Sequence, residues 1–192
     1  TCGIGMVNAA IVTERLIPFF DRLHVVINIG IAGISDQKIC ALGDWAIISE
    51  EWFGDIGVLM PDEFLPLDQI GISLHENQKN HWNMIPVSQK LADVLSEKFQ
   101  KPLVSGITVN AVSGSTSRIH ELQKLAPIFA ENMEGAAIAY VSWLHHARYA
   151  EIRAISNQVG VRDKSKWKIK ESLENFSNDM PEILTTLSDF ED

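Results

Sequence analysis

Four polar or soft side chains stand at the ends of apolar segments in the second half of the chain. Met133 and Glu134 open a helix of small residues, and Arg153 and Asn157 lie on or just past an apolar strand. Together they supply a thioether, a carboxylate, a guanidinium and a side-chain amide. If these groups converge at strand ends, they suit a sugar that carries a heterocycle.

The carboxylate has more than one interpretation. A Glu in the first turn of a helix is commonly there because the helix dipole favours it. Alternatively, Glu134 accepts hydrogen bonds from two ribose hydroxyls, and Met133 forms the apolar floor of the sugar site. Glu131 precedes Glu134 by three residues and could be the binding carboxylate instead.

Arg153 and Asn157 also have a structural and a functional interpretation. An Arg in a strand often pairs with a carboxylate as a structural tie, and an Asn after a strand is a common turn residue. As a binding residue, Asn157 could donate from its amide to N7 or to the 6-oxo group of a purine, while Arg153 holds a neighbouring carboxylate or water. Asn suits a 6-oxopurine because its donor and acceptor are fixed, whereas a protonated Asp would suit a 6-aminopurine.

Helices alternate with apolar strands along the chain, which predicts an α/β layered sheet in one domain over residues 1–192. One strand is expected to be apolar on both faces, to end in a turn at Gly30–Gly33, and to be followed by a second strand and by binding loops in 54–86. The closing helix is expected to be interrupted near Pro181. The expected strands are 24–31, 44–50, 103–112, 128–132 and 150–156, and the expected helices are 6–20, 87–99, 118–125, 134–146 and 167 onward.

Composition and motif spacing exclude several classes of function. The net charge of −9, with no block of five like charges, argues against nucleic-acid or anionic-membrane partners. No apolar run approaches the ~20 residues that span a bilayer, and Cys2 and Cys40 indicate reduced thiols in the cytoplasm. Neither a metal-ligand spacing nor a nucleophile elbow is present. The turn expected at Gly30–Gly33 carries no Arg or Lys, which disfavours phosphate as a co-substrate.

Several short motifs, taken in order, resemble those of the nucleoside phosphorylase/nucleosidase superfamily. Within it, the chain is most similar to the futalosine hydrolases of menaquinone biosynthesis, and next to the methylthioadenosine/S-adenosylhomocysteine nucleosidases. The resemblance implies a three-layer α/β/α fold around a mixed, partly barrel-like sheet. It also implies a homo-oligomer (dimer or higher) without a cofactor that hydrolyses the N-glycosidic bond of futalosine and releases hypoxanthine. The motifs are Thr1–Ala10, Asn28–Gly33, Gly43–Asp44, Gly54–Gly57, Glu131–Gly135 and Arg153–Asn157.

The resemblance also assigns roles by position. Met133 and Glu134 match the ribose-binding pair, Arg153 matches the arginine that supports it, and Asn157 stands where adenosine-type nucleosidases have a catalytic Asp. Four further substrate-binding positions are implied: Ile31, in place of a Ser; Ala111 and Val112, beside the base; and Phe53, near the loop that meets the 5′ substituent.

The family carries an N-terminal strand pair with a water-activating Glu, and this chain starts after the position of that pair. Two alternatives therefore stay open. One is a nucleosidase for 6-aminopurine substrates such as methylthioadenosine. The other is an inactive nucleoside-binding or assembly subunit.

Overall fold

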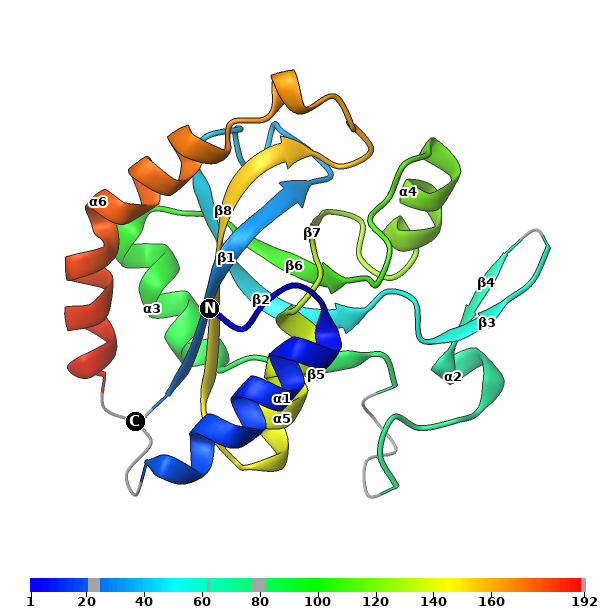
Figure 1. The fold of residues 1–192 in the computed structure, drawn as a ribbon, viewed down its shortest axis with the longest axis horizontal. Coiled ribbons are helices and arrows are strands. Elements are labelled where there is room, and N and C mark those ends of the chain that lie inside the picture. The colour runs from blue at the N-terminus through cyan, green and yellow to red at the C-terminus, as the bar shows by residue number, and fades with distance from the viewer. Residues whose placement is uncertain (21–24, 62, 77–81, 191–192) are drawn as a thin grey trace.

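A six-stranded mixed sheet forms the centre of the molecule in the computed structural model, which describes residues 1–20, 25–61, 63–76 and 82–190 (Figure 1). Its order is β5-β2-β6-β7-β1-β8, and a further pairing between β2 and β8 closes the strands from β2 to β8 into a ring. The predicted mixed, partly barrel-like sheet is therefore confirmed. The strands are β1 (Val26–Ile34), β2 (Trp45–Phe53), β5 (Met84–Pro86), β6 (Leu103–Thr108), β7 (Phe129–Asn132) and β8 (Tyr149–Gln158).

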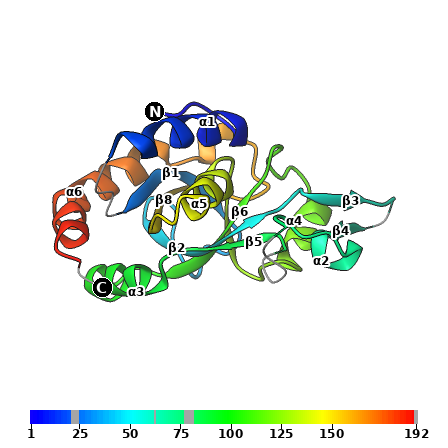
Figure 2. The same ribbon diagram turned by 90° about the horizontal axis from the view of Figure 1, so that it is seen from below.

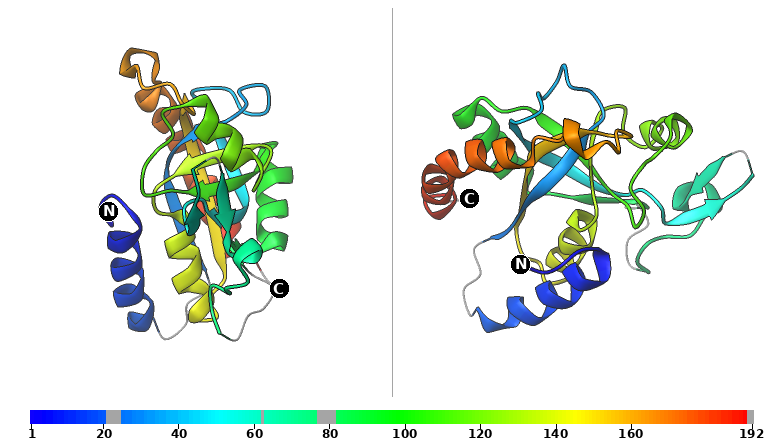
Figure 3. Two further views of the ribbon diagram at one scale, coloured as in Figure 1. Left: turned by 90° about the vertical axis from the view of Figure 1, so that its right-hand side faces the viewer. Right: turned by 45° about the horizontal axis from the view of Figure 1, so that its top comes forward.

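Helices cover the sheet on two sides and make the predicted three layers. The helices α1 (Met6–Leu16) and α5 (Gly135–Leu144) pack on each other on one side, and α3 (Gln89–Phe99) lies on the other (Figure 3, left). The long helix α6 (Ile169–Ser188) packs along β8 and contacts α3. None of the helices in the described part of the chain is long and apolar enough to cross a membrane.

The segment expected to be rich in loops carries only small elements. A ribbon of β3 (Gly57–Leu59) and β4 (Phe64–Pro66), followed by α2 (Leu67–Ile70), projects from the body (Figure 2). The other short helices are η1 (Ile17–Phe19), α4 (Thr116–Gln123) and η2 (Lys164–Lys166). The loop-rich segment predicted at 54–86 is thus confirmed for the residues of it that the structure describes.

The composition of α5 explains its depth in the fold. Its first five residues are Gly135, Ala136, Ala137, Ile138 and Ala139, and all of them are buried. Small side chains allow the helix backbone to lie close to the sheet, and this places the start of α5 directly over the strand ends.

Two expectations about the first strand are wrong. Gly30–Gly33 is not a turn, because β1 continues through it to Ile34 while pairing in parallel with β8, with a bulge between Ala32 and Gly33. The strand is also not fully buried on both faces, as a parallel strand apolar on both faces was expected to be, because Ile29 and Ile31 remain 40% and 37% exposed. The expected first residue of the strand, at position 24, lies outside the described residues.

The interruption expected at Pro181 is also absent. Helix α6 runs without a break from Ile169 to Ser188 with Pro181 inside it. Pro181 is exposed, whereas Phe176, Ile183 and Leu187 are buried on the other face. A proline removes one hydrogen bond, and on the solvent side this loss is small compared with the burial of three apolar side chains.

Candidate functional site

A cavity of about 310 Å³ opens beside the C-terminal ends of β1 and β8. Among its lining residues are five of the predicted ones, and these come from four separate parts of the chain. The five are Ile31, Val112, Met133, Glu134 and Asn157. The pair predicted to bind ribose and the amide predicted to bind a purine therefore lie at one cavity.

Three other predicted residues lie outside this lining. Arg153 is buried directly beneath it, with 2% of its side chain exposed. Ala111 is exposed next to Val112 on the loop after β6. Phe53 is buried at the end of β2, where its ring meets Tyr140 with 6.3 Å between centroids, so it belongs to the core.

Glu134 does not cap its own helix. It has no side-chain cap hydrogen bond, and the amide oxygen of Asn132 instead accepts from the backbone N–H groups of Glu134 and Gly135 at 3.0 and 2.7 Å. The Glu134 Oε1 atom accepts from the Gly5 N–H at 2.9 Å, and 18% of the side chain stays exposed. Because Asn132 does the capping, the Glu134 carboxylate is free to face the cavity.

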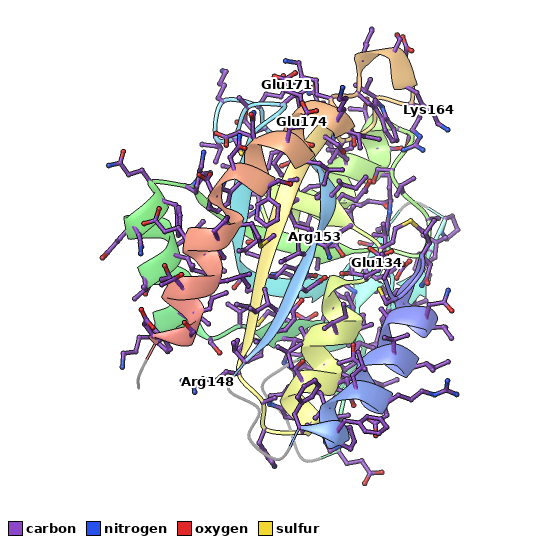
Figure 4. All side chains as sticks on the ribbon, turned by 60° about the vertical axis from the view of Figure 1, so that its left-hand side comes forward. Glu134, Arg148, Arg153, Lys164, Glu171 and Glu174 are labelled. Atoms are coloured by element: carbon purple, nitrogen blue, oxygen red, sulfur yellow. The ribbon has the colours of Figure 1, made fainter. Side chains whose placement is uncertain are left out.

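Arg153 on β8 points toward Glu134 at the start of α5 (Figure 4). Its Nη1 atom lies 3.9 Å from Glu134 Oε2, and its Nε atom donates to Glu151 Oε1 at 2.5 Å. A third contact runs from Nη2 to the Asn132 amide oxygen at 3.2 Å. Arg153 is therefore a structural tie to Glu151 and also a cation close to Glu134. A Cβ at Gly30 would overlap Nη1, so only glycine leaves room for this side chain.

Two buried carboxyl groups near Arg153 were not predicted from the sequence. Glu51 and Glu151 are both 0% exposed, on β2 and β8. Glu51 accepts from Thr108 Oγ1 at 2.8 Å and from the Asn132 side chain at 2.7 Å, and Tyr149 donates its hydroxyl to Glu151. The available signal was an acidic residue inside an otherwise buried strand, which is rare unless the group is paired.

The surroundings of Glu51 favour the protonated form of its carboxyl group. Burial raises the pKa of Glu51 well above its usual value, and the Glu151 carboxylate raises it further, although Arg153 lowers it. Arg153 thus lies near three acids, of which Glu151 has the direct hydrogen-bonded ion pair. A neutral Glu51 avoids the cost of an unpaired charge in the interior.

The Glu51→Gln variant is expected to gain stability relative to the natural protein as the pH rises. Folded Glu51 keeps its proton above the ordinary Glu pKa of about 4.3, at which the unfolded chain loses it. Its stabilising contribution is complete below that pH and is lost as the pH rises toward the raised value. Gln cannot titrate, so the difference in unfolding free energy should grow by at most about 1.4 kcal/mol per pH unit. Denaturant titrations at about pH 5 and about pH 8 measure this, and an equal difference at both would contradict it.

Asn157 stands at the bulge near the end of β8. Its amide oxygen accepts from Ser156 Oγ at 2.9 Å, and its amide nitrogen donates to the Gln158 carbonyl at 3.0 Å. The side chain is half-buried in the cavity wall. A Cβ at Gly33 would lie 2.9 Å from the Asn157 amide nitrogen, so the glycine leaves space beside it. One amide hydrogen remains available to a ligand.

The rim carries one cation. Arg162 lines the cavity and lies over the ring of Trp167, with 5.2 Å between the guanidinium carbon and the ring centroid. In the part of the chain that the structure describes, no group of three or more His, Cys, Asp or Glu side chains could hold a metal ion. The lining thus combines the acids Glu131 and Glu134 with an amide, a guanidinium and apolar walls at the end of a parallel strand pair.

Comparison with known proteins gives a consistent family. Residues 1–189 match the family model described as the phosphorylase superfamily. The futalosine hydrolase of Acidothermus cellulolyticus is 34% identical over 151 residues, which are 78% of this chain and 59% of that protein. The futalosine hydrolase of Thermus thermophilus is 32% identical over 173 residues, covering 89% and 73%. The chain thus spans about three fifths of the length of the first of these relatives.

The fold also matches a solved nucleosidase. The 5′-methylthioadenosine/S-adenosylhomocysteine nucleosidase of Colwellia psychrerythraea, solved in complex with adenine, superimposes with a TM-score of 0.77. The superposition covers 97% of this chain and 76% of that one, at 22% identity. At this level of identity the match establishes a shared fold and nothing finer.

Proposed function

Because the chain belongs to the phosphorylase superfamily, we propose that it hydrolyses the N-glycosidic bond of futalosine and releases hypoxanthine, a step of menaquinone biosynthesis. The observation that carries the proposal is the convergence of Glu134 and Asn157 on one cavity. The two futalosine hydrolases at 34% and 32% identity support the choice of substrate.

The sugar half of the reaction rests on Glu134. Its carboxylate accepts hydrogen bonds from the 2′ and 3′ hydroxyls of the ribose, above the apolar side chain of Met133. Arg153, with Nη1 at 3.9 Å, orients that carboxylate and partly balances its charge. A negative group beneath the sugar favours the positive charge that develops on the ring in an oxocarbenium-like transition state.

The base half rests on Asn157. As the bond between C1′ and N9 breaks, both electrons leave with the purine, water adds its oxygen to C1′, and the displaced proton ends on hypoxanthine. The free amide hydrogen of Asn157 donates to N7 or to the 6-oxo group, where negative charge builds up. One preorganised donor of this kind typically lowers the activation free energy by about 3 kcal/mol.

The proposal extends to the assembly and the location of the protein. We place it in the cytoplasm as a homo-oligomer, dimer or higher, that acts on a small purine nucleoside. The free thiols of Cys2 and Cys40 support the location. Exposed apolar side chains along α1 and η1 support association, because a contiguous patch of this kind often marks an interface. They are Val7, Ile11, Leu16 and Phe19.

The test is hypoxanthine release by the purified protein at its full natural length, with methylthioadenosine as the competing substrate. We expect kcat/KM to be at least about tenfold higher for futalosine, because the amide of Asn157 donates to its 6-oxo group. The Asn157→Asp variant should lose about 10²–10³ in turnover of futalosine and gain relative activity on methylthioadenosine. Gln158→Glu is the matched control, since Gln158 is the next residue and is exposed.

The outcomes separate the candidate functions. Preferential cleavage of methylthioadenosine by the natural protein would favour the 6-aminopurine nucleosidase. Saturable binding of futalosine without release of hypoxanthine would favour a binding subunit. Absence of binding to either nucleoside would refute the assignment altogether.

A further inference from the structure

Three neighbouring strands align one carboxylate, one glycine and one amide across the cavity floor. Gly33 pairs with Glu131 on β7 in antiparallel register and with Asn157 on β8 in parallel register. Paired residues on adjacent strands direct their side chains to the same face. Glu131 and Asn157 therefore lie on either side of Gly33, with the Asn157 amide leaning over the glycine, and two strand spacings place their Cα atoms roughly 9–10 Å apart.

Glu131 lines the cavity and has hydrogen-bond acceptor positions that Ser113 does not fill. It is 7% exposed, and the Ser113 N–H lies 3.0 and 3.1 Å from its two oxygens. The Ser113 hydroxyl donates to Oε2 as well. A carboxylate has about four acceptor positions, and Ser113 supplies two donors, so acceptor capacity remains toward the cavity. Burial raises the pKa of Glu131, while Ser113 and the nearby Arg118 and Arg162 lower it.

The chemistry of the two classes of purine differs at the ring nitrogen next to the 6-substituent. A 6-oxopurine carries a hydrogen on N1, whereas a 6-aminopurine presents a lone pair there. Asn157 can donate its remaining amide hydrogen to N7 or to the 6-oxo group from one side of Gly33, which leaves the N1 edge of the base for the other side. The group on that side is Glu131.

We propose that Glu131 accepts the N1–H of the 6-oxopurine and is thereby a specificity-determining residue against 6-aminopurines. The inference rests on the proposed function and deepens it, because it adds a second contact to the base. With a 6-aminopurine, the lone pair of N1 would face the carboxylate and both groups would stay unpaired. Such an unpaired contact is what lets a polar pocket reject an analogue strongly.

A purely structural role for Glu131 would be to hold the Ser113 loop between β6 and α4. That role and the proposed one differ in what they predict for the substrate. A structural role affects all nucleosides alike, whereas contact with N1–H affects only substrates that carry this hydrogen.

The test is the Glu131→Gln variant with three substrates: futalosine, its N1-methyl derivative and its 6-amino counterpart. Gln can still accept from Ser113 through its carbonyl, so the fold should be retained, as thermal unfolding will show. We expect kcat/KM for futalosine to fall about 10–100-fold, because a hydrogen bond to a charged group contributes about 1.5–3 kcal/mol. The 6-amino compound should react as fast as before or faster, and the penalty for N1-methylation seen in the natural protein should largely disappear.

The matched control is Glu50→Gln. Glu50 lies on β2, outside the cavity lining, and accepts from Ser105 Oγ at 3.0 Å, much as Glu131 accepts from Ser113. It should leave the preference for futalosine over the 6-amino compound unchanged. The inference is wrong, while the proposed function stands, if Glu131→Gln lowers kcat/KM equally for all three substrates. It is also wrong if N1-methylation lowers kcat/KM as much in the variant as in the natural protein. If the natural protein cleaves none of them, the proposed function fails and the inference fails with it.

Discussion

Replacement of Glu134 by Gln is expected to lower kcat/KM for futalosine by about 10²–10⁴. The carboxylate would make two charge-assisted hydrogen bonds to the ribose, each contributing about 1.5–3 kcal/mol, and tenfold in rate corresponds to about 1.4 kcal/mol. The neutral amide keeps the shape and one acceptor, yet it presents a donor where a second acceptor is needed. Initial rates of hypoxanthine release measure the effect.

Two further variants make this result interpretable. Glu134→Ala should be at least as impaired, since it removes both acceptors. Glu121→Gln on α4 is the control, because that acid pairs with Arg118 and is absent from the cavity lining. The Gly5 N–H would lose an acceptor in the Ala variant, so thermal unfolding must accompany the rates. Unchanged turnover in a folded Gln variant would refute the ribose-binding role.

Replacement of Arg153 by Met should reduce the free energy of unfolding by about 3–5 kcal/mol, because it leaves the Glu151 carboxylate buried without its cation. For a chain of 192 residues this corresponds to a fall in Tm of roughly 6–20 °C. Differential scanning calorimetry gives the value. Lys170→Met is the control, since its pair with Glu174 is exposed and should matter by less than about 1 kcal/mol.

The double variant Arg153→Met with Glu151→Leu distinguishes an unpaired charge from a simple loss of packing. If the unpaired carboxylate causes the loss, the double variant should be more stable than Arg153→Met alone, because it removes the charge as well as the cation. Equal or lower stability of the double variant would contradict that explanation.

The parts of the site that the sequence revealed are those that depend on local order along the chain. Met133 and Glu134 directly precede a helix, and Asn157 lies near the end of a strand that runs parallel to β1. Because the carboxyl ends of parallel strands meet at one edge, their convergence follows from the pattern of elements. The covering layers follow in the same way from the alternation of helices and strands.

The parts of the site that could not be predicted depend on contacts between strands that are far apart in the sequence. Glu51 lies close to Arg153 because the pairing of β2 with β8 closes the strands into a ring, inside which both side chains contact the Asn132 amide. Periodicity within β2 carries no information about that partner. In the same way, the sequence alone gives no reason for a glycine at position 30, because the need for space comes from Arg153 on another strand. The cap of α5 is equally hard to predict, because the Asn132 side chain accepts from the first N–H groups from a position on β7, outside the helix.

Strand β8 has neighbours on both edges, β1 along its whole length and β2 across Trp45–Ile47. Amide protons held between two partners exchange with deuterated solvent only when a large part of the fold opens. The backbone around Arg153, where both neighbours pair with β8, should therefore be among the last to become labelled. A ligand that docks there would meet groups already fixed in position, so little of its binding free energy would be consumed in ordering them.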